Sequence, residues 1–180
     1  MKPGARLLAV DDSPFTRGRD EKTFLVGLLF RGLILESAAK EEVTVDGDDA
    51  IEAICSLYEE TGREARIILL HGTTFAGFNM VPLRELAERT GIPVAAFLER
   101  APDIYEVISA LEKAGLTRKA LIMDRNPPYE RFETERGPIF CSYVGVGRED
   151  VASLIDKYSV ESRMPEQLRV AHIVAGLLGE

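Results

Sequence analysis

Short apolar runs and amphipathic stretches alternate along the chain and predict alternating strands and helices. The apolar run at residues 6–10 meets two aspartates and Pro14, which is typical of a buried strand that ends in a turn, because proline cannot continue a central ladder. Residues 23–30 and 33–37 flank Gly32 and predict a β-hairpin. The second hairpin strand is expected to continue to Val45 with polar, solvent-facing residues.

The middle of the chain carries alternate helical and strand patterns. Apolar residues recur at helical spacing over residues 50–58, and Asp49 followed by Glu52 has the form of a capping box. Continuous apolar runs at 65–70 and 92–98 are typical of strands buried on both faces. Further helices are expected at about 80–89, 104–111, 151–158 and 166–178, and strands at 119–123 and 139–146, separated by a surface excursion at 124–138.

This order places antiparallel strands first and right-handed strand–helix–strand crossovers afterwards. Residues 65–70 and 92–98 are expected to run parallel to residues 6–10. The order matches an α/β, ribonuclease H-like fold, which is a mixed sheet with helices on both faces. The length of 180 residues suits one well-packed core, so we expect residues 1–180 to form a single domain.

Composition narrows the function classes. The net charge of −8 argues against broad, non-specific binding to nucleic acid, which depends on cations that neutralise phosphates, although a local basic groove stays open. No apolar run approaches the roughly 20 residues that span a bilayer, and no signal peptide is recognised, so we expect a cytoplasmic protein with no membrane partner. Cys55 and Cys141 match no metal or redox spacing and are expected to be unpaired, with Cys55 buried beneath the first helix. Amides are confined to Asn79, Asn126 and Gln167, which indicates a thermophile's avoidance of labile residues.

Acidic residues gather where the expected strands meet their following segments. Asp11 and Asp12 close the first strand, Asp48 and Asp49 precede the first helix, and His71 follows the next buried strand. Because these points converge at one end of the expected sheet, we interpret the four aspartates as ligands of Mg²⁺ or Mn²⁺, which would relieve their repulsion. Asp11, Asp12, Asp48 and His71 are the candidate catalytic residues, since such an ion activates water and stabilises charge on a phosphodiester. Turn-forming or helix-capping aspartates and a structural histidine remain alternatives.

Two loops near these acids carry groups suited to phosphate. Thr73 and Thr74 lie in a glycine-containing segment between a strand and a helix, where open α/β sheets commonly bind ligands. Arg17, Arg19 and Lys22 form a basic loop just after the first acids. We interpret these five residues as candidate nucleic-acid contacts, with a solvated basic loop as the alternative.

Four strings resemble those of a known family. They are VDDSPF at 10–15, TVDGDDA at 44–50, GTTFAGFN at 72–79 and TGIPV at 90–94. Over about residues 6–180 the chain resembles the largely archaeal family called domain of unknown function 99. That family is also catalogued as uncharacterised protein family 0215 and is distantly similar to endonuclease V.

The resemblance implies an endonuclease V-like, ribonuclease H-like fold. In endonuclease V, acids on the first strand, at the start of the first helix and after the fourth strand hold a divalent metal used to cut near deaminated bases. Asp11 or Asp12 matches the first acid and Asp48 or Asp49 approximately the second, whereas His71 stands in the place of the third. Three interpretations therefore stay open. The first is a metal-dependent phosphodiesterase or nuclease acting on nucleic acid, and the second is a non-catalytic module that recognises a nucleotide, a nucleic acid end or a protein partner. The third is a different small-molecule enzyme that uses the same cleft.

Overall fold

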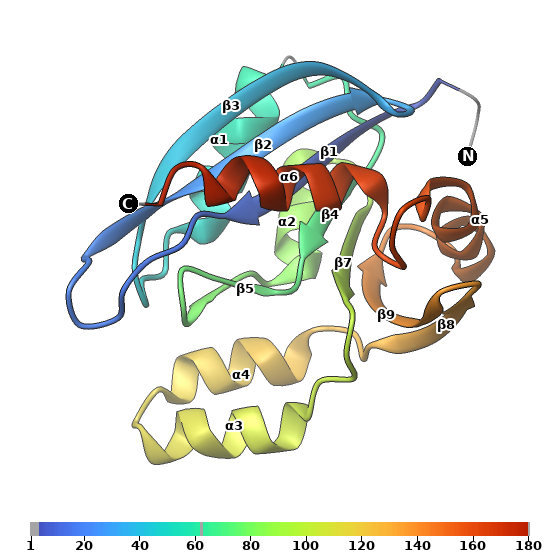
Figure 1. The fold of residues 1–180 in the computed structure, drawn as a ribbon. Coiled ribbons are helices and arrows are strands. Elements are labelled where there is room, and N and C mark those ends of the chain that lie inside the picture. Colours follow the sequence, from blue (N-terminus) through green and yellow to red (C-terminus); the bar gives the residue numbers. More distant parts are fainter. Residues whose placement is uncertain (1–3, 62, 180) are drawn as a thin grey trace.

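A seven-stranded mixed sheet with helices on both faces organises the protein, whose computed structural model describes residues 4–61 and 63–179 (Figure 1). The strands of the sheet are β1 (Arg6–Asp12), β2 (Lys22–Arg31), β3 (Ile34–Thr44), β4 (Ile68–His71), β7 (Val94–Leu98), β8 (Glu130–Thr134) and β9 (Gly137–Val144). The helices are α1 (Ala50–Glu60), α2 (Leu83–Thr90), α3 (Ile104–Lys113), α4 (Thr117–Arg125), α5 (Arg148–Tyr158) and α6 (Glu166–Gly176). A separate small hairpin pairs β5 (Thr74–Phe75) with β6 (Asn79–Met80).

The strand order is β3-β2-β1-β4-β7-β9-β8. Strands β1, β2 and β3 pair antiparallel, whereas β4 and β7 run parallel to β1, which confirms the predicted mixed sheet. In the parallel pair of β1 and β4, Val10 lies opposite Leu70. The next residues of the two strands, Asp11 and His71, therefore lie side by side near the carboxyl ends of β1 and β4.

Each face of the sheet is covered by a different pair of helices. Leu8 and Val10 of β1 pack in a core with α1 and α2, and Leu7 and Ala9 pack in a second core with α5 and α6. In Figure 1, α6 crosses in front of β1 and β2, and α1 and α2 lie behind the sheet. Because successive strand side chains point to opposite faces, Asp11 belongs to the α6 side of the sheet.

Two expectations from the sequence are wrong. Residues 119–123, expected as a strand, lie inside α4, where Leu116, Ala120 and Met123 recur at helical spacing and pack against α3. An apolar run this short does not distinguish a strand from a buried helical turn. The stretch 124–138, expected as a surface excursion, contains β8, which pairs antiparallel with β9 and extends the sheet.

The two cysteines are unpaired, as predicted. Cys141 is buried, whereas Cys55, expected to be buried, is partly exposed and packs at the margin of the core beneath α1. Within the described part of the chain, no helix combines the length and the apolar character needed to cross a membrane.

Candidate metal centre

Two imidazoles contact one carboxylate oxygen at the carboxyl ends of β1 and β4. Nδ1 of His71 on β4 and Nδ1 of His172 on α6 each lie 2.9 Å from Oδ2 of Asp11. The Asp11 side chain is 3% exposed, that of His71 30% and that of His172 68%. One ligand atom from each residue lies within 4.8 Å of the other two. The arrangement therefore combines a buried carboxylate with two imidazole nitrogens and a side open to solvent.

Three elements distant in sequence assemble this group. The parallel register of β1 and β4 brings Asp11 beside His71. Helix α6 packs on the same face of the sheet through Leu168, Ala171 and Ala175. His172 lies on this helix at the end of β1, as its contact with Asp11 shows. The two imidazole rings meet edge to face, with centroids 5.5 Å apart.

A proton and a metal ion would compete for His71. Its hydrogen bond with Asp11 raises the pKa of the imidazole, burial opposes that shift, and the charges of Asp11 and Asp12 add to it. A metal binds the neutral imidazole, so raising the pH through the pKa of His71 frees a ligand for the ion.

Asp12 has a different environment from its neighbour. Its Oδ2 accepts a hydrogen bond of 2.6 Å from the backbone N–H of Ala76. Burial raises the pKa of Asp12 to about 6; the Ala76 N–H lowers it and the charge of Asp11 raises it further. Among the described residues, the group of ligand atoms that converge for an ion contains Asp11 but not Asp12.

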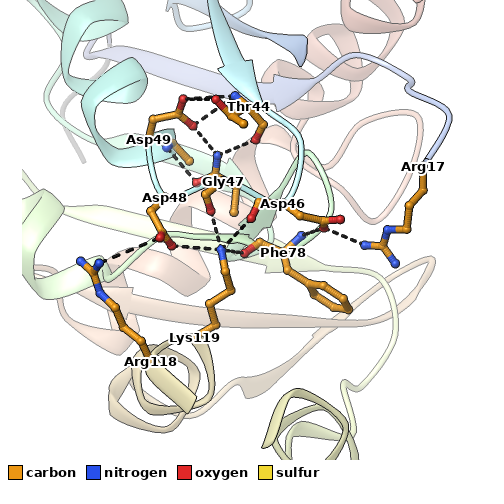
Figure 2. A network of polar contacts seen from close by, with 11 residues as sticks. Arg17, Thr44, Asp46, Gly47, Asp48, Asp49, Phe78, Arg118 and Lys119 are labelled. Carbon is orange, nitrogen blue, oxygen red and sulfur yellow. Dashed lines mark hydrogen bonds and ion pairs between the residues drawn. The ribbon is translucent and has the colours of Figure 1, made fainter. Parts of the chain in front are cut away.

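The acidic loop between β3 and α1 is held by basic side chains of α4 (Figure 2). Oδ1 of Asp48 lies 3.0 Å from Nζ of Lys119, and its Oδ2 lies 3.9 Å from Nη1 of Arg118. Lys119 is buried, and its ammonium also donates to the backbone oxygens of Asp46, Gly47 and Phe78. Asp48 is therefore engaged by this lysine, and the structure does not bring it into the group of Asp11.

Asp49 makes hydrogen bonds that hold the same loop. Its carboxylate accepts hydrogen bonds from the backbone and hydroxyl of Thr44 and from the amide of Asn79. Burial would raise the pKa of Asp49, but these hydrogen bonds outweigh it and leave the pKa below its ordinary value. Asp49 flanks α1, yet its side chain makes no capping hydrogen bond to that helix.

The basic loop lies beside this network. The guanidinium of Arg17 stacks over the ring of Phe78 at 4.5 Å and lies 2.9 Å from Oδ1 of Asp46. Arg19 and Lys22 have largely exposed side chains, and Lys22 forms an ion pair with Glu42. Arg17 is thus held by both a ring contact and an ion pair.

A cavity of about 650 Å³ opens beside α3 and α4. Its lining includes Thr73, Tyr105, Tyr129 and Phe140. The hydroxyl of Tyr129 lies 3.5 Å from Oγ1 of Thr73, and burial raises the pKa of Tyr129 to about 12, so this phenol stays protonated. Thr73 is buried at the cavity wall, whereas Thr74 is partly exposed at the start of β5.

His172 is the site residue that sequence reasoning missed. Two signals were present: the chain has only two histidines, and His172 lies four residues after Leu168 on an expected helix. Its partner, however, lies 161 positions away, and the pairing depends on which face of the sheet α6 covers.

Comparison with known sequences places the chain in a family. The model of the endonuclease dU family matches residues 3–178. The chain belongs to the endonuclease dU family. One relative is a UPF0215 protein of Methanosarcina barkeri, which is 37% identical over 187 residues. The alignment covers 100% of this chain and 94% of the relative. A UPF0215 protein of Thermoplasma volcanium is 36% identical over 180 residues, covering 98% of the chain and 91% of the relative.

Solved structures confirm the predicted fold. A protein of unknown function from Archaeoglobus fulgidus superposes with a TM-score of 0.83 and 27% identity, covering 95% of this chain and 96% of that one. Endonuclease V of Streptomyces avermitilis gives a TM-score of 0.63 at 12% identity, with 96% and 81% coverage. Ciona intestinalis endonuclease V, in complex with a 24mer DNA containing an inosine followed by a ribo-adenosine, gives 0.57 at 17% identity, with 93% and 82% coverage. This endonuclease dU family chain therefore has the ribonuclease H-like fold of endonuclease V.

Proposed function

We propose that this chain is a metal-dependent phosphodiesterase that cuts nucleic acid, with a divalent ion held by Asp11, His71 and His172. The observation that carries the proposal is the convergence of both imidazoles on the buried Asp11 carboxylate, each at 2.9 Å. The family name, endonuclease dU, and the endonuclease V structures with bound DNA support nucleic acid as the substrate class.

The donor set fits a divalent cation. The Asp11 carboxylate lies away from solvent, where an uncompensated charge is costly, and the facing nitrogens can share a cation with it. Such an ion, when bound, supplies activated water and stabilises the charge that develops on the phosphodiester. The exposed side of His172 leaves room for a large polymeric substrate to reach the centre.

The other expected site residues take supporting roles in this proposal. Asp12 accepts the N–H of Ala76 and thereby fixes the loop that follows His71. Asp48 and Asp49 shape the loop before α1 through Lys119 and Thr44. The two loops are joined by the backbone N–H of Asp46, which donates to the oxygen of Ala76 at 2.8 Å. We therefore assign these three aspartates to positioning and not to binding the ion.

The basic and hydroxyl groups expected to contact nucleic acid keep that role. Arg17 and Arg19 lie on the loop after β1, Lys22 begins β2, and Thr73 and Thr74 follow His71 by two and three residues. In a protein with a net charge of −8, these local cations and the bound ion would supply most of the attraction for phosphates.

The test is cleavage of DNA that carries one deoxyuridine, compared with the same DNA carrying thymidine. We expect cleavage with Mn²⁺ and none after chelation. Asp11→Asn should lower the rate by about 10³-fold or more, because it removes the only anionic member of the ligand group. Asp156→Asn, at an exposed position of α5, should keep the parental rate and controls for the loss of a carboxylate as such. The loss of cleavage in Asp11→Asn purified in the same way excludes a contaminating nuclease.

Equal cleavage by the parent and Asp11→Asn would contradict the proposal. Metal-dependent binding of DNA without cleavage, lost in Asp11→Asn, would favour the non-catalytic binding module instead.

A further inference from the structure

We infer that the two histidines make this centre selective for first-row transition ions. Among Zn²⁺, Co²⁺ and Mn²⁺, the centre binds Zn²⁺ most tightly. His71 is the residue that excludes Mg²⁺. The inference rests on the proposed metal site and goes beyond it, because a site for hard ions and one for transition ions differ in their donor atoms.

The donor set is the first argument. Two of the three converging ligand atoms are imidazole nitrogens, and one is a carboxylate oxygen. Mg²⁺ prefers oxygen ligands and gives up its water reluctantly, whereas imidazole suits zinc and the later first-row ions. Two histidines and one carboxylate, with a further position open, are also the ligands of a common class of catalytic zinc site.

Charge is the second argument. With neutral imidazoles the ligand group of Asp11, His71 and His172 carries one negative charge. The nearby carboxylates are engaged elsewhere, Asp12 with the N–H of Ala76 and Asp48 with Lys119. The charge of Glu99 also acts on His71, but within the described residues Glu99 is not among the converging ligand atoms. The group therefore lacks the several carboxylates with which proteins hold a hard cation.

The distribution of soft ligands is the third argument. The chain has two histidines among its 180 residues, and both contact the same oxygen of Asp11. The two cysteines lie elsewhere, Cys55 on α1 against the opposite core and Cys141 inside β9. Zinc binding by a thiolate is thus separable from zinc binding at this centre.

The experiment compares ions and not reaction rates. Metal-free protein is titrated calorimetrically with Zn²⁺, Co²⁺, Mn²⁺ and Mg²⁺, and the Co²⁺ complex is followed by its visible absorption. We expect Zn²⁺ to bind at least ~100-fold more tightly than Mg²⁺. His71→Asp should narrow that ratio by roughly 10-fold or more, since it replaces a nitrogen with a hard oxygen and adds a negative charge.

Two further variants distinguish zinc binding at this centre from zinc binding by a cysteine. Cys55→Ala should leave the Zn²⁺ affinity unchanged. His172→Asn changes a side chain that is 68% exposed, and it should weaken Zn²⁺ more than Mg²⁺. This second variant keeps the inference testable if His71→Asp does not fold.

Two results overturn the inference in different ways. Comparable Zn²⁺ and Mg²⁺ affinities, or a ratio that neither histidine variant changes, would refute the selectivity while leaving a metal-dependent nuclease intact. Absence of binding by every divalent ion would refute both the selectivity and the proposed function.

Discussion

At the residue scale, Asp11 and Asp12 show how one position along a strand decides the chemistry of a side chain. Asp11 extends the α6 side of β1 and meets His71 and His172. Asp12 meets the backbone of Ala76 instead, and burial leaves it with a pKa of about 6. The sequence predicts an acidic strand end, but not which aspartate faces the histidines, because that follows from the register and from the helix on each face.

Asp12→Asn should stabilise the metal-free protein at about pH 8 and leave it nearly unchanged at about pH 4. Folding raises the pKa of Asp12 from 3.8 to about 6, so the parent protein loses stability as the pH rises through that interval. The asparagine side chain of the variant does not ionise, so the variant does not lose this stability. The gain should be roughly 1 kcal/mol, because partial solvation of this side chain reduces the effect of the shift. Chemical denaturation at both pH values measures it, and a variant less stable than the parent at the higher pH would contradict the assignment.

At the element scale, α4 and the loop before α1 depend on each other. Lys119, on a helix that was expected to be a strand, inserts a buried ammonium among three backbone oxygens and Asp48 (Figure 2). The hairpin of β2 and β3 and the parallel strands were predictable, because their apolar runs and turn residues are local signals. Strand β8 was not, because its pairing with β9 is decided by tertiary contacts. Asp11 and His71 were predictable as neighbours at strand ends, and His172 on α6 was not.

Lys119→Met should destabilise the protein by about 2–4 kcal/mol, since it leaves buried carbonyl oxygens and the carboxylate of Asp48 without their donor. Arg118→Met is the matched control: this side chain is 79% exposed and 3.9 Å from Asp48, so its loss should cost less than about 0.5 kcal/mol. Guanidinium denaturation of the two variants compares them. Equal stability losses would show that the lysine network contributes nothing beyond a surface ion pair.

At the scale of the whole molecule, the end of the chain returns to its beginning. Helix α6 packs across β1 and β2 in Figure 1 and supplies His172 to a centre begun by β1. Arg17, on the loop after β1, stacks its guanidinium on the ring of Phe78, so these two loops lie close together. Arg17, a candidate phosphate contact, therefore lies against Phe78 and Asp46.

Binding of single-stranded DNA to the Asp11→Asn variant should depend only modestly on salt. With about three phosphates neutralised, the slope of log K against log salt should be roughly −2, and Arg17→Ala or Arg19→Ala should each reduce its magnitude by about 0.7. Lys157→Ala, on α5, should leave the slope unchanged. Fluorescence anisotropy over a salt series gives the values. A slope insensitive to both arginine variants would remove the basic loop from the interface.

Anomalous diffraction from crystals of the metal-free protein soaked in Zn²⁺ tests the metal centre most directly. We expect one strong peak about 2.0–2.2 Å from a carboxylate oxygen of Asp11 and from a ring nitrogen of both His71 and His172. A peak held by Asp48 and Asp49, or no peak at Asp11 at saturating Zn²⁺, would contradict the account.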